Sequence, residues 1–248
     1  MIALLGALQA EMYHTARRIE ATEQLKWADR EIITGSLGGQ RVVCTWTGSG
    51  IAHSALTTQY ICSRFQPEAL LYAGIGAALN PMYQLGDTVI AVDAIQWDLD
   101  TSAIGGGPGV FPGSQPDNSR LREILSHPGL SKRLRESAKK QTNRSTSGAV
   151  VYTGRLLSGD RFLPIDGGRA LRGRLRDSFQ GDLADMESSS VVLAGLRNKV
   201  PSAVLRIVSD TVAGEHPENF RRFLDDCSIR SADVFECFLG SLSENPLW

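Results

Sequence analysis

The sequence predicts an α/β fold, a three-layer sandwich in which helices flank a central mixed and twisted sheet. Two observations support this class. Short apolar runs, typical of strands buried on both faces, alternate along the chain with stretches of helical periodicity. One early segment instead has the strand–turn–strand pattern of an antiparallel hairpin, so we expect parallel and antiparallel strands in the same sheet.

The first quarter of the chain contains this hairpin. The apolar run over residues 2–8 is predicted to form a strand, and a helix should extend from Glu11 to about Glu20. Residues 31–50 form the predicted hairpin, which turns at the pair Gly38-Gly39. A helix is expected over residues 51–65.

The middle of the chain continues the alternation. Residues 68–79 and 86–96 have the composition of buried strands, and the glycines of "AGIGAA" should close the first of them with a turn. The glycine- and proline-rich residues 101–119 form a predicted loop. We interpret it as functional and not as a domain linker, because regular elements continue on both sides and neither half is self-sufficient. One domain over residues 1–248 is therefore expected.

The remaining elements complete the predicted sheet and its helical layers. Helical periodicity is present near residues 119–126. In the basic segment 131–144 we interpret the Lys and Arg side chains as the solvated face of a helix, with a docking patch as the alternative. The later elements are a strand and turn over 149–163, a helix over 167–179, strands over 181–187 and 202–210, and a helix over 219–242.

Composition narrows the possible functions. A formal net charge of −1 gives no sign of nucleic acid or of an anionic membrane as a partner. The apolar run at the start is too short to span a bilayer and has no basic residues before it, so we expect a strand of a cytoplasmic protein, not a signal peptide. Neither a disulfide frame nor a metal or other cofactor is expected, because the cysteines (44, 62, 227 and 237) and histidines (14, 53, 127 and 216) are scattered.

Three carboxylates stand at the ends of predicted strands, where open α/β sheets gather ligands. Glu11 follows the first strand, Glu187 lies in "ADMES", and Asp210 ends the strand over 202–210. Each has an ordinary explanation, because helix starts favour acidic side chains. Their conjunction at one sheet edge indicates a site, since a buried unpaired charge is costly.

Seven segments in a fixed order carry a resemblance to a known family. They are "LLGALQAEM", "TGSGIAHSA", "AGIGAALNPMYQLGD", "WDLDTSAIGGGPGVFPG", "LLSGDRFL", "ADMES" and "LRIVSD", the last followed ten residues later by Phe220. From Leu4 to Phe223 the chain resembles the nucleoside phosphorylase and nucleosidase superfamily, and within it most closely the 5′-methylthioadenosine/S-adenosylhomocysteine nucleosidases. The resemblance implies the fold of that superfamily and cleavage of the N-glycosidic bond of a purine nucleoside.

The resemblance also implies the two catalytic residues. Adenine is a poor leaving group as an anion, so the reaction needs a proton on N7 while C1′ develops oxocarbenium character. Asp210 is the implied general acid. Glu11 matches the carboxylate with which the family activates the attacking water.

Further residues are implied to bind the substrate. Glu187 would accept hydrogen bonds from the ribose 2′- and 3′-hydroxyls, which offsets the cost of its burial, and Met186 would pack against the sugar. Asp185 is expected to bond a nearby backbone group, and a purely structural role stays open. The other implied contacts are Ala77 through its backbone, Phe162 stacked near the base, Leu163 reading the base edge, Arg206 and Ser209 orienting the acids, and Phe220 closing the pocket.

The loop from Asp100 to Gly113 resembles the one that family members extend across a dimer interface. The resemblance therefore implies a homodimer in which Ile104, Phe111 and Pro112 cover the neighbour's site for the 5′-substituent. Three consecutive glycines, 105–107, replace the bulkier residues usual in bacterial relatives, so we expect a more open and mobile wall. The identity of the 5′ group is therefore open.

Hydrolysis is expected in preference to phosphorolysis. Phosphorylases of this fold hold phosphate with an arginine and a serine at the positions of Tyr72 and Ile75, and with a glycine and an arginine in the first loop. Here the first loop carries Glu11, whose charge would repel phosphate. One departure points the other way, because the nucleosidases usually have a serine in place of Ile75 that helps to hold the water.

The leading hypothesis is hydrolysis of 5′-thio-substituted adenosines, such as methylthioadenosine and S-adenosylhomocysteine, to adenine and the thioribose. One alternative keeps the chemistry and changes the substrate to a futalosine-type or other 5′-modified purine nucleoside. A phosphorylase and a non-catalytic nucleoside-binding relative are further alternatives. The presence of Glu11, Glu187 and Asp210 argues against the non-catalytic one.

Overall fold

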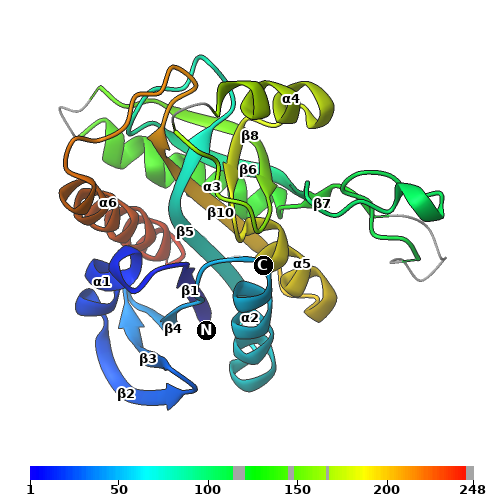
Figure 1. The fold of residues 1–248 in the computed structure, drawn as a ribbon. Helices are drawn as coiled ribbons and strands as arrows, with labels where there is room; N and C mark the ends of the chain where they lie inside the picture. Colours follow the sequence, from blue (N-terminus) through cyan, green and yellow to red (C-terminus); the bar gives the residue numbers. More distant parts are fainter. Residues whose placement is uncertain (114–120, 145–147, 166–167, 244–248) are drawn as a thin grey trace.

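Parallel and antiparallel strands share one sheet, and helices cover both of its faces (Figure 1). The computed structural model describes residues 1–113, 121–144, 148–165 and 168–243. The strands of these residues are β1 (Ile2–Gly6), β2 (Glu20–Trp27), β3 (Arg30–Leu37), β4 (Gln40–Trp46), β5 (Ala69–Ala78), β6 (Thr88–Gln96), β7 (Ile124–Leu125), β8 (Val151–Ser158), β9 (Leu183–Asp185) and β10 (Ser202–Asp210). The helices are α1 (Gln9–Arg18), α2 (Ile51–Phe65), α3 (Pro128–Thr142), α4 (Arg169–Phe179), α5 (Ser188–Asn198) and α6 (Phe220–Ser241), with a 3₁₀ turn at Ser102–Ile104. The predicted α/β class is confirmed.

β5 is the strand on which the site is built. The sheet order is β10-β6-β8-β9-β5-β1-β4-β3-β2, and β10 pairs with β5 as well as with β6. β5 runs parallel to β1 and β10, so the carboxyl ends of these three strands lie at the same edge. β9 runs antiparallel to β5 and meets its last residues, Ala77 and Ala78, which places the residues after β9 beside that edge.

Two apolar cores lie on opposite faces of the sheet. Along β1, Leu4 packs into the core that contains Phe235 of α6, whereas Leu5 packs into the core that contains Val191 of α5. This alternation follows from the two-residue period of a strand. The helices accordingly form two outer layers, with α1, α3 and α6 in one and α2 and α5 in the other, as Figure 1 shows.

The predicted hairpin is confirmed, but it belongs to a longer meander. β3 and β4 pair antiparallel, and Gly38 and Gly39 between them both have positive φ. The sequence predicts no strand over residues 20–27, yet β2 forms there and pairs with β3. The side chains of β2 are mostly exposed, so this strand carries no apolar pattern by which it could be recognised.

The strand predicted over residues 68–79 is confirmed, but the turn predicted at the glycines of "AGIGAA" is wrong, because β5 continues through these glycines to Ala78. A Cβ atom on Gly74 would collide with the guanidinium of Arg206 and the carboxylate of Glu11. A Cβ atom on Gly76 would collide with the side chain of Leu183 in β9. Glycine is therefore needed at both positions because neighbouring side chains approach the strand closely, and not because the chain turns there.

The helix predicted over residues 119–126 is wrong in its described part. Leu121 forms an isolated bridge with Phe111, and β7 pairs antiparallel with β6. The spacing of Leu121, Ile124 and Leu125 also fits a helix face, so the pattern was ambiguous and pairing with β6 decided it. Residues 119 and 120 of this prediction, residues 114–119 of the predicted loop and residue 167 of the predicted helix over 167–179 lie outside the described residues.

The basic segment is helical, as predicted. In α3, Leu130 and Leu134 are buried, while Lys132, Lys139 and Lys140 are exposed, which confirms a solvated basic face. The helices in the described ranges are all too short or too polar to cross a membrane.

Candidate functional site

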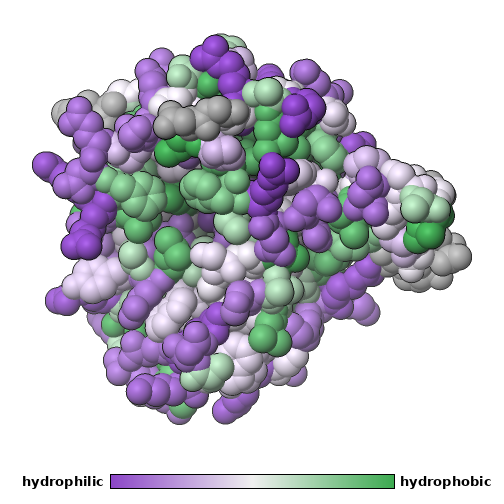
Figure 2. All heavy atoms as spheres, viewed as in Figure 1, coloured by the Kyte–Doolittle hydropathy of each residue, from purple (hydrophilic) through white to green (hydrophobic). Residues whose placement is uncertain are grey.

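A cavity of about 230 Å³ opens at the sheet edge where β1, β5, β9 and β10 end. Figure 2 shows a hollow on this face of the molecule with apolar side chains around it. The cavity brings together both predicted catalytic residues and most of the predicted binding residues. Its lining residues are Ala7, Leu8, Glu11, Ser49, Ile75, Gly76, Ala77, Arg161, Phe162, Leu163, Ala184, Asp185, Met186, Glu187, Ser209, Asp210 and Phe220.

Two aromatic side chains stand at the cavity without being buried in a core. Phe162, in the loop after β8, is 72% exposed, and Phe220, the first residue of α6, is 50% exposed. Leu163 beside them is buried. Exposed rings at a concave site offer a flat apolar ligand a surface for stacking.

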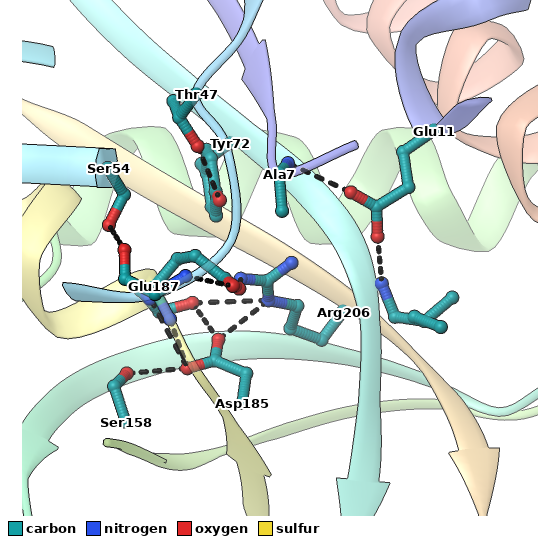
Figure 3. A network of polar contacts seen from close by, with 12 residues as sticks. Ala7, Glu11, Thr47, Ser54, Tyr72, Ser158, Asp185, Glu187 and Arg206 are labelled. Atoms are coloured by element: carbon teal, nitrogen blue, oxygen red, sulfur yellow. Dashed lines mark hydrogen bonds and ion pairs between the residues drawn. The ribbon is translucent and has the colours of Figure 1, made fainter. Parts of the chain in front are cut away.

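Glu11 reaches the cavity from the first turn of α1 and is 4% exposed. Its Oε2 atom accepts hydrogen bonds from the backbone N–H groups of Ala7 (2.8 Å) and Leu8 (2.9 Å), and its Oε1 atom accepts one from Ile75 (3.0 Å; Figure 3). Burial raises the pKa of this carboxyl, although the charge of Arg206 and the backbone donors act in the opposite direction. A carboxyl with a raised pKa beside a cavity suits a general base.

Arg206 lies fully buried in β10 beneath the cavity and does not line it. Its Nε atom donates to Asp185 Oδ2 (2.7 Å), and its Nη2 atom donates to Glu187 Oε2 (3.1 Å; Figure 3). The guanidinium carbon stands 4.6 Å from the centre of the Tyr72 ring. Burial lowers the pKa of Arg206, but the neighbouring acids, Asp185 first, raise it above its ordinary value, so the group stays cationic.

One donor of Arg206 is left over. Its Nη1 atom is buried and makes no hydrogen bond within the described ranges. This atom and Glu11 Oε1 are the nearest neighbours of the place that a Cβ on Gly74 would take, so they lie on the same side of β5. A carboxylate oxygen and a free N–H therefore converge beside the cavity.

Glu187 joins the cavity to the helical layer that contains α2 and α5. It is 5% exposed, and its Oε1 atom accepts a hydrogen bond from the backbone N–H of Gly50 (3.0 Å). Burial raises its pKa to about 7, while Arg206 lowers it and Asp185 adds to the increase. Glu187 occupies the N-cap position of α5 but makes no side-chain capping bond, so the helix-start explanation does not account for this acid.

Asp185 has the backbone contacts that we expected. Its Oδ1 atom accepts hydrogen bonds from the N–H groups of Glu187 and Ser188, both at 3.2 Å. It also accepts one from the hydroxyl of Ser158 at 2.5 Å. Together with the ion pair to Arg206, these bonds join the ends of β8 and β9 and the middle of β10 to the start of α5.

Asp210 stands where the pairing of β10 with β5 shifts register between Val208 and Asp210. Such a bulge re-aims a side chain at the end of a strand. The hydroxyl of Ser209 donates to Asp210 Oδ1 (2.8 Å) and lies 3.1 Å from the carbonyl oxygen of Gly76. Because the next helix begins ten residues later, Asp210 is not a helix N-cap.

Arg172 was not predicted as a site residue from the sequence, and it forms an ion pair with Asp210 Oδ2. Arg172 belongs to α4 and shares its buried face with Leu175 and Phe179. A charged residue at an apolar-face position was the signal that could have found it, since burial of a charge without a partner is costly. The identity of that partner could not be read from the helix pattern.

Ile104 and Pro112 do not line this cavity. They belong to residues 97–113 after β6, which project from the body of the molecule in Figure 1, and Ile104 is 74% exposed. In the described ranges, no group of three or more His, Cys, Asp and Glu side chains is arranged to hold a metal ion.

Known proteins share this architecture over nearly the whole chain. Residues 1–240 match the family model described as the phosphorylase superfamily. The 5′-methylthioadenosine/S-adenosylhomocysteine nucleosidase of Staphylococcus aureus (strain JH9) is 24% identical over 250 residues, which cover 98% of this chain and 100% of the relative.

Solved structures agree with this match. The crystal structure of a Campylobacter jejuni 5′-methylthioadenosine/S-adenosylhomocysteine nucleosidase is 26% identical, with a TM-score of 0.86 over 97% of this chain and 99% of that one. The futalosine hydrolase of Helicobacter pylori is 24% identical, with a TM-score of 0.84 over 97% of both chains, a likeness that concerns the fold.

Proposed function

The chain belongs to the phosphorylase superfamily, and on that premise we propose that it is a purine nucleosidase that hydrolyses 5′-thio-substituted adenosines to adenine and the thioribose. One observation carries the proposal. Glu11 from the first turn of α1 and Asp210 from the end of β10 line one cavity, together with the exposed rings of Phe162 and Phe220. A base and an acid beside an apolar surface for the purine are what cleavage of an N-glycosidic bond needs.

Asp210 is the proposed general acid. It would donate a proton to N7 of the base as the bond between C1′ and N9 breaks, so that adenine leaves as a neutral molecule. Ser209 and Arg172 bind one carboxyl oxygen each, which holds the group in one orientation. Orientation matters because proton transfer requires the donor within hydrogen-bond reach of its acceptor.

Glu11 is the proposed base that takes a proton from the attacking water. Three backbone N–H groups hold its carboxylate, and the Nη1 atom of Arg206 lies near its Oε1 atom. A water between these two groups would donate to the carboxylate and accept from the guanidinium. The oxygen lone pair would then be directed at C1′ while the proton passes to Glu11.

Glu187 and Met186 are the proposed ribose contacts. An ionised Glu187 has lone pairs beyond those used by Gly50 and Arg206, and these can accept hydrogen bonds from the two ribose hydroxyls. Arg206 supports this role, because its charge favours the ionised form of Glu187.

Water is a better nucleophile than phosphate for this cavity. Glu11, Asp185 and Glu187 line it, and a phosphate dianion beside them would be repelled. Tyr72, at a position where phosphorylases bind phosphate, is buried under Arg206, and its hydroxyl lies 3.2 Å from Thr47 Oγ1.

A second candidate substrate differs from the first in its 5′-substituent. A bulky 5′-modified nucleoside of the futalosine type is favoured by residues 105–107, which present no side chains beyond hydrogen, and by the fold shared with a futalosine hydrolase. We propose that the projecting segment with Ile104 and Pro112 covers this substituent in the neighbouring subunit of a homodimer. Its exposed position outside the chain's own cavity is consistent with that arrangement.

The proposal is tested by incubating the protein with methylthioadenosine, S-adenosylhomocysteine and futalosine, each with and without phosphate. Chromatography of the products should show free purine base and a free sugar in the absence of phosphate. A strict requirement for phosphate, or a sugar 1-phosphate as product, would contradict hydrolysis. The ratio of kcat/KM values across the three substrates identifies the preferred 5′ group.

A further inference from the structure

Arg172 is among the largest fully buried side chains of the protein, and it lies outside the set of residues that line the cavity. It is 1% exposed and occupies the core-facing side of α4 with Leu175 and Phe179. A guanidinium in such a place costs several kcal/mol unless it is paired and hydrogen-bonded. The hydrogen-bond partners of Arg172 therefore indicate its role.

One partner, Asp210, lines the cavity, and the other, Ala78, is the last residue of β5. Arg172 Nη2 donates to Asp210 Oδ2, and Nη1 donates to the carbonyl oxygen of Ala78 at the end of β5 (3.0 Å). Asp210 Oδ1 is held separately by the hydroxyl of Ser209. The side chain of Asp210 is 10% exposed, so solvent screens this ion pair only weakly.

We propose that Arg172 is a positioning residue that acts through Asp210 and favours transfer of the Asp210 proton to the purine. The inference rests on the proposed function. In that step the O–H bond of Asp210 breaks and a bond between N7 and hydrogen forms. The electron pair of the bond between C1′ and N9 stays with the base, and the water oxygen bonds to C1′ as its proton passes to Glu11.

The charge of Asp210 changes during this step, and the charge of Arg172 does not. Asp210 is neutral while it holds the proton and becomes a carboxylate as the proton leaves. A fixed guanidinium stabilises the carboxylate more than the neutral acid, so its interaction is stronger in the transition state than in the substrate complex. Arg172 should therefore act on kcat and leave KM nearly unchanged.

A purely structural ion pair between α4 and β10 is the competing explanation, and the leaving group separates the two. A 4-nitrophenyl riboside with the same 5′-methylthio group leaves as a stable phenolate and needs no proton from Asp210. If Arg172 acts on proton transfer, its loss should affect the purine nucleoside and spare the nitrophenyl riboside. A structural role would affect both substrates alike.

The main variant is Arg172→Met, which keeps a long side chain and removes the charge. Turnover is compared at the plateau of each enzyme's pH profile, where the rate does not depend on pH. We expect kcat for methylthioadenosine to fall about 100-fold, the size usual for one acid–base or preorganised electrostatic contribution. KM for methylthioadenosine and kcat for the nitrophenyl riboside should change less than about threefold.

Two further variants test whether the effect passes through Asp210. In an Asp210→Asn background the acid is absent, so adding Arg172→Met should cause no further loss of turnover. Arg172→Lys keeps the cation and should recover at least about tenfold of the loss seen with Arg172→Met. Arg174→Met, on the exposed side of the same helix, is the matched control and should behave as the wild type.

The outcomes are distinct. Equal losses on both leaving groups, or a further loss in the Asp210→Asn background, would overturn the inference and leave Arg172 as a structural residue. A wild-type chain that releases no purine base would overturn the proposed function, and the inference with it. If Arg172→Met does not fold, Arg172→Lys decides the question by whether its loss is confined to the purine substrate, and circular dichroism verifies the fold of each variant.

Discussion

The backbone N–H of Ile75 donates a hydrogen bond to Glu11 Oε1 over 3.0 Å, although 64 residues separate the two in sequence. The bond joins β5 to the first turn of α1 and positions the proposed base. It also helps to explain why isoleucine can stand at position 75, where the nucleosidases usually have serine. Because the backbone makes the bond, isoleucine in place of serine leaves the carboxylate in the same position and removes a hydroxyl beside it.

The first prediction concerns Ile75→Ser. The backbone bond to Glu11 should persist, and the new hydroxyl can donate to the water or to the carboxylate. A hydrogen bond contributes about 1 kcal/mol, so kcat should rise roughly fivefold. Ile75→Val, which trims the side chain without a hydroxyl, is the control; a similar gain in both variants would show that space, and not the hydroxyl, is responsible.

Glu11→Gln tests the proposed base. The amide is similar in shape but cannot take a proton from water, so kcat should fall about 10²- to 10⁴-fold. Some loss of stability, about 1–3 kcal/mol, is expected because the amide NH₂ group would face a backbone donor. Steady-state kinetics and thermal unfolding measure the two effects, and Glu23→Gln on the exposed face of β2 is the control. Near-normal turnover in a folded Glu11→Gln would reassign the base.

The pH dependence follows from two buried carboxyls. Burial raises the pKa of Glu187 to about 7 and raises the pKa of Glu11 as well. Both groups must be ionised in the proposed mechanism, and a raised pKa keeps an acid protonated to higher pH. The value of kcat/KM should therefore fall as the pH drops through about 7, well above the range in which an exposed glutamate titrates.

The control for this profile is Glu187→Gln, which removes one of the two titrations. It should raise KM, because the neutral amide makes weaker hydrogen bonds to the ribose hydroxyls, and the remaining acidic limb should reflect Glu11. A value of kcat/KM that stays constant from pH 8 to about pH 5 would rule out a role for the ionised form of Glu187.

Phe162→Ala separates binding from stability. The ring is 72% exposed in the free protein, so its removal should leave the thermal unfolding temperature nearly unchanged. Stacking of a base on an aromatic ring contributes about 1–3 kcal/mol, so KM should rise between about fivefold and 150-fold. Phe162→Leu should recover part of the affinity. An unchanged KM for the purine nucleoside would show that the ring does not contact the base.

Much of the fold and of the site could be predicted from local patterns. Apolar runs identify strands, and a strand's end is a place where polar side chains meet a ligand, so Glu11, Glu187 and Asp210 could be assigned to one edge before their positions were known. Two strands could not be predicted in this way. β2 is polar and exposed, and β7 has a spacing that fits a helix as well as a strand.

The sequence by itself determined the α/β class and the hairpin. It also indicated that the three acids lie at one edge of the sheet, and its resemblance to a known family suggested their roles. The tertiary structure alone decided which groups meet: Arg172 with Asp210, the Ile75 backbone with Glu11, and Nη1 of Arg206 with Glu11 Oε1 beside Gly74. The physical reason is that periodicity reports which face of an element is buried. It does not report what that face packs against, because partners distant in sequence are set by the packing of whole helices and strands.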